Sequence, residues 1–160
     1  MRGKWFEEIA VGERLELGSF AFSAEEIVAF ARRYDPQPFH LDEEAGAKSY
    51  LGGLCASGWQ TTAAFMKCCA VSDQAGRAAA AAKGKVLPPV GPSPGFEDLK
   101  WLRPVYVGDT IAYASTATAK RALASKPGWG LVFFHNEGVN QKGETVMSFT
   151  GKLLVARQTP

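Results

Sequence analysis

SGWQTTAAFMKCCAV, residues 57–71, is the stretch of sequence that decides the fold of this chain. Ser57 is a residue type that caps helices, and nothing after Gly58 breaks a helix before Val71. Apolar side chains follow on nearly every face of that helix: Trp59, Ala63, Ala64, Phe65, Met66, Cys68, Cys69 and Val71. A helix that is apolar on most faces is buried, so residues 57–71 are expected to run through the centre of a domain.

The sequence downstream of this helix indicates β-structure. Three or four long antiparallel strands are expected within residues 96–105, 108–122 and 130–157. NQKGE at 140–144 predicts a hairpin turn, because its glycine accepts positive φ. One face of the last strand consists of Thr145, Met147, Phe149, Gly151, Leu153 and Val155. This alternation is typical of a strand with one face on a core.

Residues 76–95, GRAAAAAKGKVLPPVGPSPG, separate the helix from these strands. Their five alanines offer a continuation of the helix, but the prolines and glycines that follow predict a loop. The sequence leaves open whether this loop is a mobile lid or is packed against the domain.

The sequence upstream predicts a strand at residues 13–22 and then an amphipathic helix. Ser23 and Glu26 form a capping-box pattern, and the apolar residues that follow have helical spacing. Pro36 ends this helix, so Asp35 falls at its C-terminal edge.

The order is therefore strand, helix, loop, long buried helix and long antiparallel strands, in a single domain of residues 1–160. A curved antiparallel sheet wrapped around one long helix satisfies this order, which is an α+β protein with the hot-dog fold. Such a sheet leaves an open edge strand, so a homodimer with sites near its interface is expected.

Composition and charge argue against several classes of protein. The net charge is +2, from 18 basic and 16 acidic residues spread evenly, whereas nucleic-acid-binding proteins usually carry a basic stripe. The first residues lack the apolar run of a secretory signal, and the apolar stretch 61–71 is too short to span a bilayer. Three cysteines without a CxxC pattern predict free thiols, no zinc site and a cytoplasmic location.

YDPQPFHLD, residues 34–42, contains the candidate chemistry. A carboxylate at Asp35 and an imidazole at His40 can hold one water between them and share the tasks of accepting and returning a proton. Pro36 and Pro38 stiffen the backbone between the two, and small misplacements of catalytic groups cost rate. The alternative is a surface loop with an incidental histidine.

The wider segment ARRYDPQPFHLDEEAGAKS resembles the signature of the MaoC-like dehydratase family, which includes the (R)-specific enoyl-CoA hydratases. The matching positions are Asp35, Pro38, His40, Asp42 and Ala45. CASGWQTTA, WLRPVYVGDTI and VNQKGETVMSFTGKLLV resemble further segments of the family in the same order, and FEEIAVGERL also fits. The resemblance covers nearly the whole chain apart from residues 76–95.

The resemblance implies a hydro-lyase that adds water to, or removes it from, an enoyl-CoA-type acyl thioester, with CoA as part of the substrate and no separate cofactor or metal. Asp35 and His40 would be the catalytic pair, and either one is a candidate base. Gly58 would polarise the thioester carbonyl with its backbone N–H, because the unpaired N–H groups and dipole at a helix start favour negative charge. Substrate contacts are expected from Phe39, Ser57 and Trp59.

The sequence departs from the family pattern at several positions. Gln37 replaces Asn, Phe39 replaces an aliphatic residue, and Ser57 replaces the His before the glycine. Met66 lies near the counterpart of a serine found in characterised hydratases. The Asp–His pair itself is intact.

Two other functions share this fold. A hot-dog thioesterase usually carries an acidic residue on or near the central helix, and residues 57–71 contain neither Asp nor Glu. A non-catalytic acyl-CoA-binding protein would need neither Asp35 nor His40. Both observations favour the hydro-lyase.

Five further residues have a structural and a functional interpretation. His135 is expected in or beside the core rather than as a second catalytic histidine, and Asp42 as a helix cap rather than a second acid. Arg103, Lys120 and Arg121 are candidates for contacts with CoA phosphates, although charges near strand ends are usually solvated.

Overall fold

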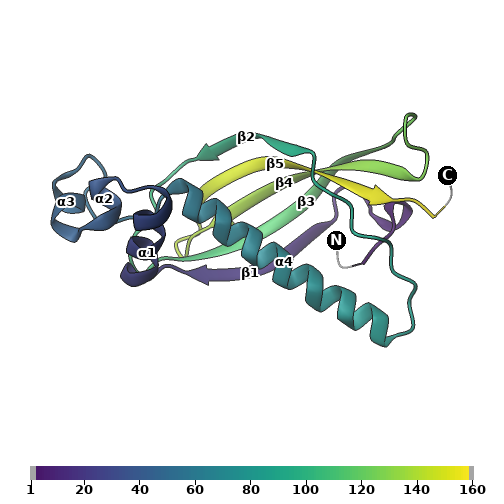
Figure 1. The fold of residues 1–160 in the computed structure, drawn as a ribbon, viewed down its shortest axis with the longest axis horizontal. Coiled ribbons are helices and arrows are strands. Elements are labelled where there is room, and N and C mark those ends of the chain that lie inside the picture. The colour runs from purple at the N-terminus through teal and green to yellow at the C-terminus, as the bar shows by residue number, and fades with distance from the viewer. Residues whose placement is uncertain (1–2, 159–160) are drawn as a thin grey trace.

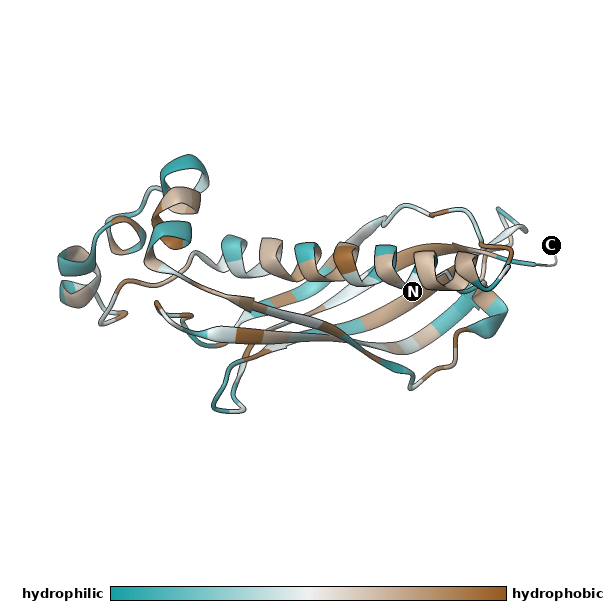
Figure 2. Ribbon diagram, turned by 90° about the horizontal axis from the view of Figure 1, so that it is seen from below, coloured by the Kyte–Doolittle hydropathy of each residue, from teal (hydrophilic) through white to brown (hydrophobic). Residues whose placement is uncertain are grey.

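The computed structural model describes residues 3–158, which form an antiparallel sheet with one long helix against it (Figure 1). The strands are β1 (Arg14–Ala21), β2 (Gly95–Trp101), β3 (Thr110–Ala122), β4 (Trp129–Val139) and β5 (Thr145–Ala156). Their order in the sheet is β1-β3-β4-β5-β2. The helix is α4 (Gly58–Ala82), and it lies along one face of the sheet (Figure 2). The predicted hot-dog fold is confirmed.

The short helices gather at the end of the sheet where α4 begins (Figure 1). They are α1 (Ala24–Tyr34), α2 (Pro38–Leu41) and α3 (Glu43–Lys48), while a 3₁₀ turn, η1 (Phe6–Glu8), lies near the N-terminus. The caps are those the sequence indicates: Ser23 accepts a hydrogen bond from the Glu26 N–H at 3.2 Å, and Asp42 accepts one from the Ala45 N–H at 2.9 Å.

The central helix begins at the predicted cap but ends later than expected. Ser57 Oγ accepts a hydrogen bond from the Trp59 N–H at 3.2 Å. The helix then continues for 25 residues to Ala82, because alanine has the highest helix propensity of all residues. Gly84, at φ +70°, ends it: the N–H groups of Gly84 and Lys85 bond back to the last turn, as in a Schellman motif. The five alanines therefore continue the helix, and the loop predicted from the prolines and glycines starts at residue 83.

The expectation that α4 is buried on most faces is wrong. Phe65 and Cys68 face the sheet and are 3% and 8% exposed, but Trp59, Met66 and Val71 are each more than half exposed. The sheet covers one side of the helix only, so apolar residues on the other sides are only partly covered by the described chain.

The main core lies between α4 and the sheet, where Phe65 meets Tyr113 and Phe149 edge-to-face. The Tyr113 hydroxyl is buried there and donates a hydrogen bond to the Thr61 carbonyl at 3.0 Å. The three cysteines are free thiols, as predicted. His135 is exposed on β4 rather than in or beside the core, which corrects the expectation for it.

The segment between α4 and β2 is packed against the domain. Arg77 Nη2 donates to the Pro88 carbonyl at 3.0 Å, and the Leu154 N–H donates to the Pro92 carbonyl at 3.1 Å. A Cβ on Gly91 would lie 1.8 Å from the Leu154 carbonyl oxygen, so only glycine allows this approach. These contacts support the packed interpretation of this loop. Among residues 3–158, no helix is both long and apolar enough to cross a bilayer.

Candidate active site

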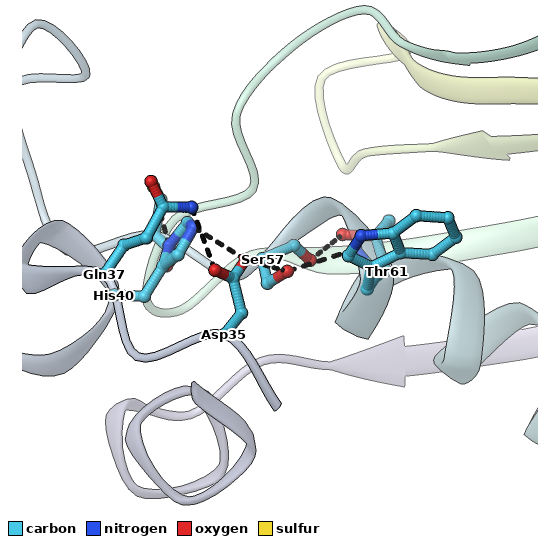
Figure 3. Close-up of polar contacts among 7 residues, drawn as sticks. Asp35, Gln37, His40, Ser57 and Thr61 are labelled. Atoms are coloured by element: carbon cyan, nitrogen blue, oxygen red, sulfur yellow. Dashed lines mark hydrogen bonds and ion pairs between the residues drawn. The ribbon is translucent and has the colours of Figure 1, made fainter. Parts of the chain in front are cut away.

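Three chain segments bring polar side chains together at the N-terminal end of α4 (Figure 3). Asp35 is the C-cap of α1, His40 lies in α2, and Ser57 is the N-cap of α4. Pro38 begins α2, where the fixed φ of proline suits the first turn of a helix. The three side chains therefore lie at the end of one helix and at the start of two others. Helix caps fix the backbone at these positions.

Asp35 and His40 face each other. His40 Nε2 is 3.5 Å from Asp35 Oδ2, and His40 is 5% exposed. On the other side of the ring, Nδ1 is 2.7 Å from the Cys55 carbonyl oxygen. A carbonyl only accepts hydrogen bonds, so Nδ1 carries a hydrogen. In the neutral imidazole, Nε2 therefore presents a lone pair toward Asp35.

The Asp35 carboxylate has two protein donors. Ser57 Oγ donates to Oδ2 at 2.6 Å, and Gln37 Nε2 donates to Oδ1 at 2.9 Å. Burial by itself raises the pKa of Asp35, but the hydrogen bonds from Ser57 and Gln37 outweigh it and lower the pKa, and the charge of His40 lowers it further when the ring is protonated. Asp35 is therefore held as a carboxylate, and its remaining lone pairs can accept from a further ligand.

A cavity of about 280 Å³ opens beside the pair. Its wall includes His40, Gly58 and apolar side chains from α2 (Phe39), β2 (Trp101) and β5 (Val146). Leu51, before α4, and Leu102, after β2, complete its apolar part. The Cys55 thiol lies behind His40, and burial raises its pKa, so it stays protonated. The only lining side chain that is always charged is that of Arg103, whose Nη1 is 3.5 Å from Glu144 Oε1.

The predicted site residues divide into two groups. His40, Phe39 and Gly58 line this cavity, and Asp35 lies behind the lining residues, in contact with His40. Within the described chain the Gly58 N–H bonds to no acceptor. Ser57 is only 1% exposed, donates a hydrogen bond to Asp35 and does not line the cavity. Trp59 points outward and is 53% exposed.

Of the three predicted substrate contacts, Phe39 lines the cavity, whereas Ser57 and Trp59 do not. Ser57 is turned away because its hydroxyl is used by the carboxylate and the helix cap. Successive residues of an α-helix are rotated by about 100° about the helix axis, so Trp59, the residue after Gly58, points to the outer face.

A match to a family model identifies the relationship of the chain. The model describes the MaoC-like domain, and residues 8–128 match it. The chain belongs to the MaoC-like domain family. This MaoC-like chain is also similar to the solved MaoC-like dehydratase from Rhodospirillum rubrum, with a TM-score of 0.81 and 34% identity over 99% of this chain and 100% of that one.

Other relatives cover less or are more distant. The R-hydratase PhaJ1 from Pseudomonas aeruginosa has a TM-score of 0.66 and 23% identity over 96% of this chain and 85% of that one, a likeness of fold. The Bacillus subtilis protein YdeM is 38% identical over 38% of this chain. Mesaconyl-CoA hydratase from Cereibacter sphaeroides is 31% identical over 40% of it. The two sequence matches span 43% and 18% of those relatives' own lengths.

Sequence reasoning missed two residues of this MaoC-like site. Trp101 comes from the end of β2 and lies against Gly58, and its Nε1 donates to Thr62 Oγ1 at 3.2 Å. No sequence pattern links either residue to Asp35 and His40, because Trp101 and Thr62 lie on different elements with a loop between them. Lys120, a candidate for CoA phosphate, instead donates to the carbonyls of Phe6, Glu7 and Ile9.

Metal ligation has no support in the described part of this MaoC-like chain. No group of three or more His, Cys, Asp or Glu side chains within residues 3–158 is placed to hold a metal ion.

Proposed function

We propose that this chain is a hydro-lyase that adds water to the C2–C3 double bond of an enoyl-CoA-type thioester, or removes it, in the manner of the (R)-specific hydratases. One observation carries the proposal: the Asp35 carboxylate and the His40 lone pair lie 3.5 Å apart beside a cavity that also exposes the start of α4. Membership of a family of dehydratases supports it.

The chemistry follows from two acceptors that share one water. A water beside the pair, within reach of both groups, donates one O–H to Asp35 Oδ2 and the other to His40 Nε2. The oxygen of this water then directs a lone pair at C3. As the C3–O bond forms, Asp35 takes the proton, and it then gives that proton to C2. Water is consumed whole, and the carboxylate is restored. His40 orients the water and Asp35 is base and then acid.

The thioester carbonyl needs a donor because negative charge develops on its oxygen when water attacks C3. The Gly58 N–H fills this role in the proposal. It belongs to the first turn of a helix of 25 residues, whose dipole favours negative charge at that end. Phe39 and the apolar wall of the cavity hold the acyl chain.

The test is hydration of crotonyl-CoA, followed by the loss of the ultraviolet absorbance of the conjugated thioester. Asp35→Asn removes the base and is expected to lower kcat by roughly 10²–10⁴-fold. Asp42→Asn is the matched control, because it makes the same change in the same segment and asparagine still caps α3. Equal activity in wild type and Asp35→Asn would contradict the proposal.

Release of free thiol in the same assay separates the hydratase from a hot-dog thioesterase. Hydration leaves the C–S bond intact, so a thiol reagent should detect no free CoA. Thiol release that depends on the protein would favour the thioesterase, and binding without either reaction would favour a non-catalytic acyl-CoA-binding protein.

We further propose that the chain assembles as a homodimer and uses no cofactor besides the CoA of its substrate. β1 and β2 are the two open edges of the sheet, and an unpaired edge strand favours pairing with another chain. The mass of the purified protein, measured by light scattering during gel filtration, tests this, and a mass near 17.2 kDa would contradict it.

A further inference from the structure

A second and larger cavity lies further along α4. Its volume is about 500 Å³, and apolar atoms of α4, β4, β5 and the 88–93 segment form most of its wall. Phe65, Met66 and Cys69 line it from α4, and Phe149 and Leu153 line it from β5. No residue lines both this cavity and the one beside Asp35 and His40.

The two cavities follow one another along the same pair of elements. The first is lined by Gly58 and Thr61 of α4 and by Val146 of β5, and the second begins at Phe65 and Phe149. At about 1.5 Å per residue, Phe65 lies roughly 10 Å along the helix axis from Gly58. The first cavity thus ends and the second begins within two turns of one helix.

Trp101 lines the first cavity and bonds to the stretch of α4 that separates that cavity from the second. A Cβ on Gly58 would be 2.3 Å from Trp101 Cδ2, so the indole rests directly on the first turn of α4. Its Nε1 donates to Oγ1 of Thr62, which lines neither cavity itself. Thr62 follows Thr61 of the first cavity in sequence and lies one helical turn before Met66 of the second, on the same face of α4. Trp59 packs edge-to-face on the indole at 5.0 Å between ring centroids. Three contacts therefore hold this side chain in place.

We propose that Trp101 is a specificity-determining residue that closes the acyl cavity beside Asp35 and His40, so that the protein selects short-chain acyl thioesters. This inference rests on the proposed function, since it takes the first cavity as the acyl site. A short chain fits in front of the indole. A long chain has to pass Trp101 and Thr62 before it reaches the apolar wall of the second cavity.

The physical basis is the apolar surface that a long acyl chain buries, which differs between the protein with the Trp101 indole and the protein without it. Each methylene that leaves water for an apolar wall strengthens binding by roughly fourfold. Methylenes beyond the indole stay in solvent while Trp101 is in place, and they gain this contact only when the two cavities are joined. Trp101→Ala removes the indole and the donor that bonds Thr62, and so opens the path along α4.

The test measures binding as well as turnover, so that it does not depend on catalysis. Dissociation constants for butyryl-CoA and dodecanoyl-CoA are measured by calorimetry with wild type and Trp101→Ala. We expect wild type to gain less than tenfold from the longer chain. We expect the variant to raise the ratio of the two affinities, dodecanoyl over butyryl, by at least tenfold over that of wild type.

Two further variants keep the inference testable if Trp101→Ala is unstable. Trp101→Phe keeps a ring but loses the N–H, and Thr62→Val keeps the shape of the partner but loses the acceptor. Each is expected to shift the ratio in the same direction by a smaller amount. Circular dichroism confirms that each variant is folded before binding is measured.

The outcomes are distinct. An unchanged ratio in folded Trp101→Ala overturns the inference, as does wild type that already binds dodecanoyl-CoA far more tightly than butyryl-CoA. No binding of either ligand also overturns it. A shifted ratio in a protein that hydrates no enoyl-CoA supports Trp101 as the selector and overturns only the proposed reaction.

Discussion

At the scale of single residues, Ser57 connects the helix cap to the candidate base. Its hydroxyl donates to Asp35 Oδ2 and accepts from the Trp59 N–H, so one side chain fixes both the start of α4 and the carboxylate. A hydroxyl can make both contacts because it donates one hydrogen bond and accepts another through the same oxygen. Ser57 thus determines how Asp35 is held.

Ser57→Ala is expected to raise the pKa of Asp35. The hydrogen bond from Ser57 stabilises the charged form of the carboxylate and so lowers its pKa. In the variant this bond is lost, and fewer contacts oppose the burial that raises the pKa. The Asp35 carboxyl carbon, followed by NMR, should therefore titrate at higher pH in the variant.

The same change should lower kcat/KM for crotonyl-CoA by about 10- to 100-fold, the effect of losing one hydrogen bond to a charged group. Ser57→Thr keeps the hydroxyl and is expected to restore the lower pKa. A titration curve that is the same in wild type and Ser57→Ala would contradict this account.

At the scale of elements, the start of α4 and the end of β2 approach so closely that only glycine fits between them. The indole of Trp101 occupies the space of a Cβ at Gly58. The same contact leaves the Gly58 N–H beside the cavity and closes the cavity on one side. The position thus requires glycine for a packing reason, in addition to any role in binding a carbonyl.

Gly58→Ala is expected to destabilise the fold by about 1–3 kcal/mol, because the new methyl overlaps the indole. In a Trp101→Ala background that cost should vanish, and the higher helix propensity of alanine should then stabilise the protein by up to about 1 kcal/mol. Urea denaturation of the four proteins completes a double-mutant cycle. The same cost in both backgrounds would show that the indole does not cause it.

At the scale of the whole molecule, stability depends on the contact between α4 and the curved sheet. Phe65 is 3% exposed and packs edge-to-face on Tyr113 and Phe149, whereas Met66, the next residue, is 56% exposed. Two neighbouring apolar residues therefore contribute unequally to the free energy of unfolding.

Phe65→Ala is expected to lower the free energy of unfolding by about 3–5 kcal/mol, since it leaves a void between the helix and the sheet. Met66→Ala is the matched control and should change stability by less than about 0.5 kcal/mol. Chemical denaturation measures both. A loss at Met66 as large as that at Phe65 would mean that the outer face of α4 is covered in solution.

Much of the fold could be predicted because it rests on short-range patterns. Ser23, Asp42 and Ser57 cap helices through residues two or three positions away, and the alternation in β5 identifies its buried face. The end of α4 was misjudged because alanines carry no amphipathic pattern. The exposed side of α4 was misjudged because the spacing of apolar residues does not tell which faces of the helix the sheet covers.

The sequence by itself determined the type and order of the elements, and it brought Asp35 and His40 into one rigid segment. Only the tertiary structure decided the partners of that pair. His40 meets the Cys55 carbonyl across 15 positions, Ser57 reaches Asp35 across 22, and Trp101 reaches Thr62 across 39. Local structure follows from caps and from the spacing of residues a few positions apart. Contacts between distant residues arise only when helices and strands pack, and no repeating sequence pattern records which residues then meet.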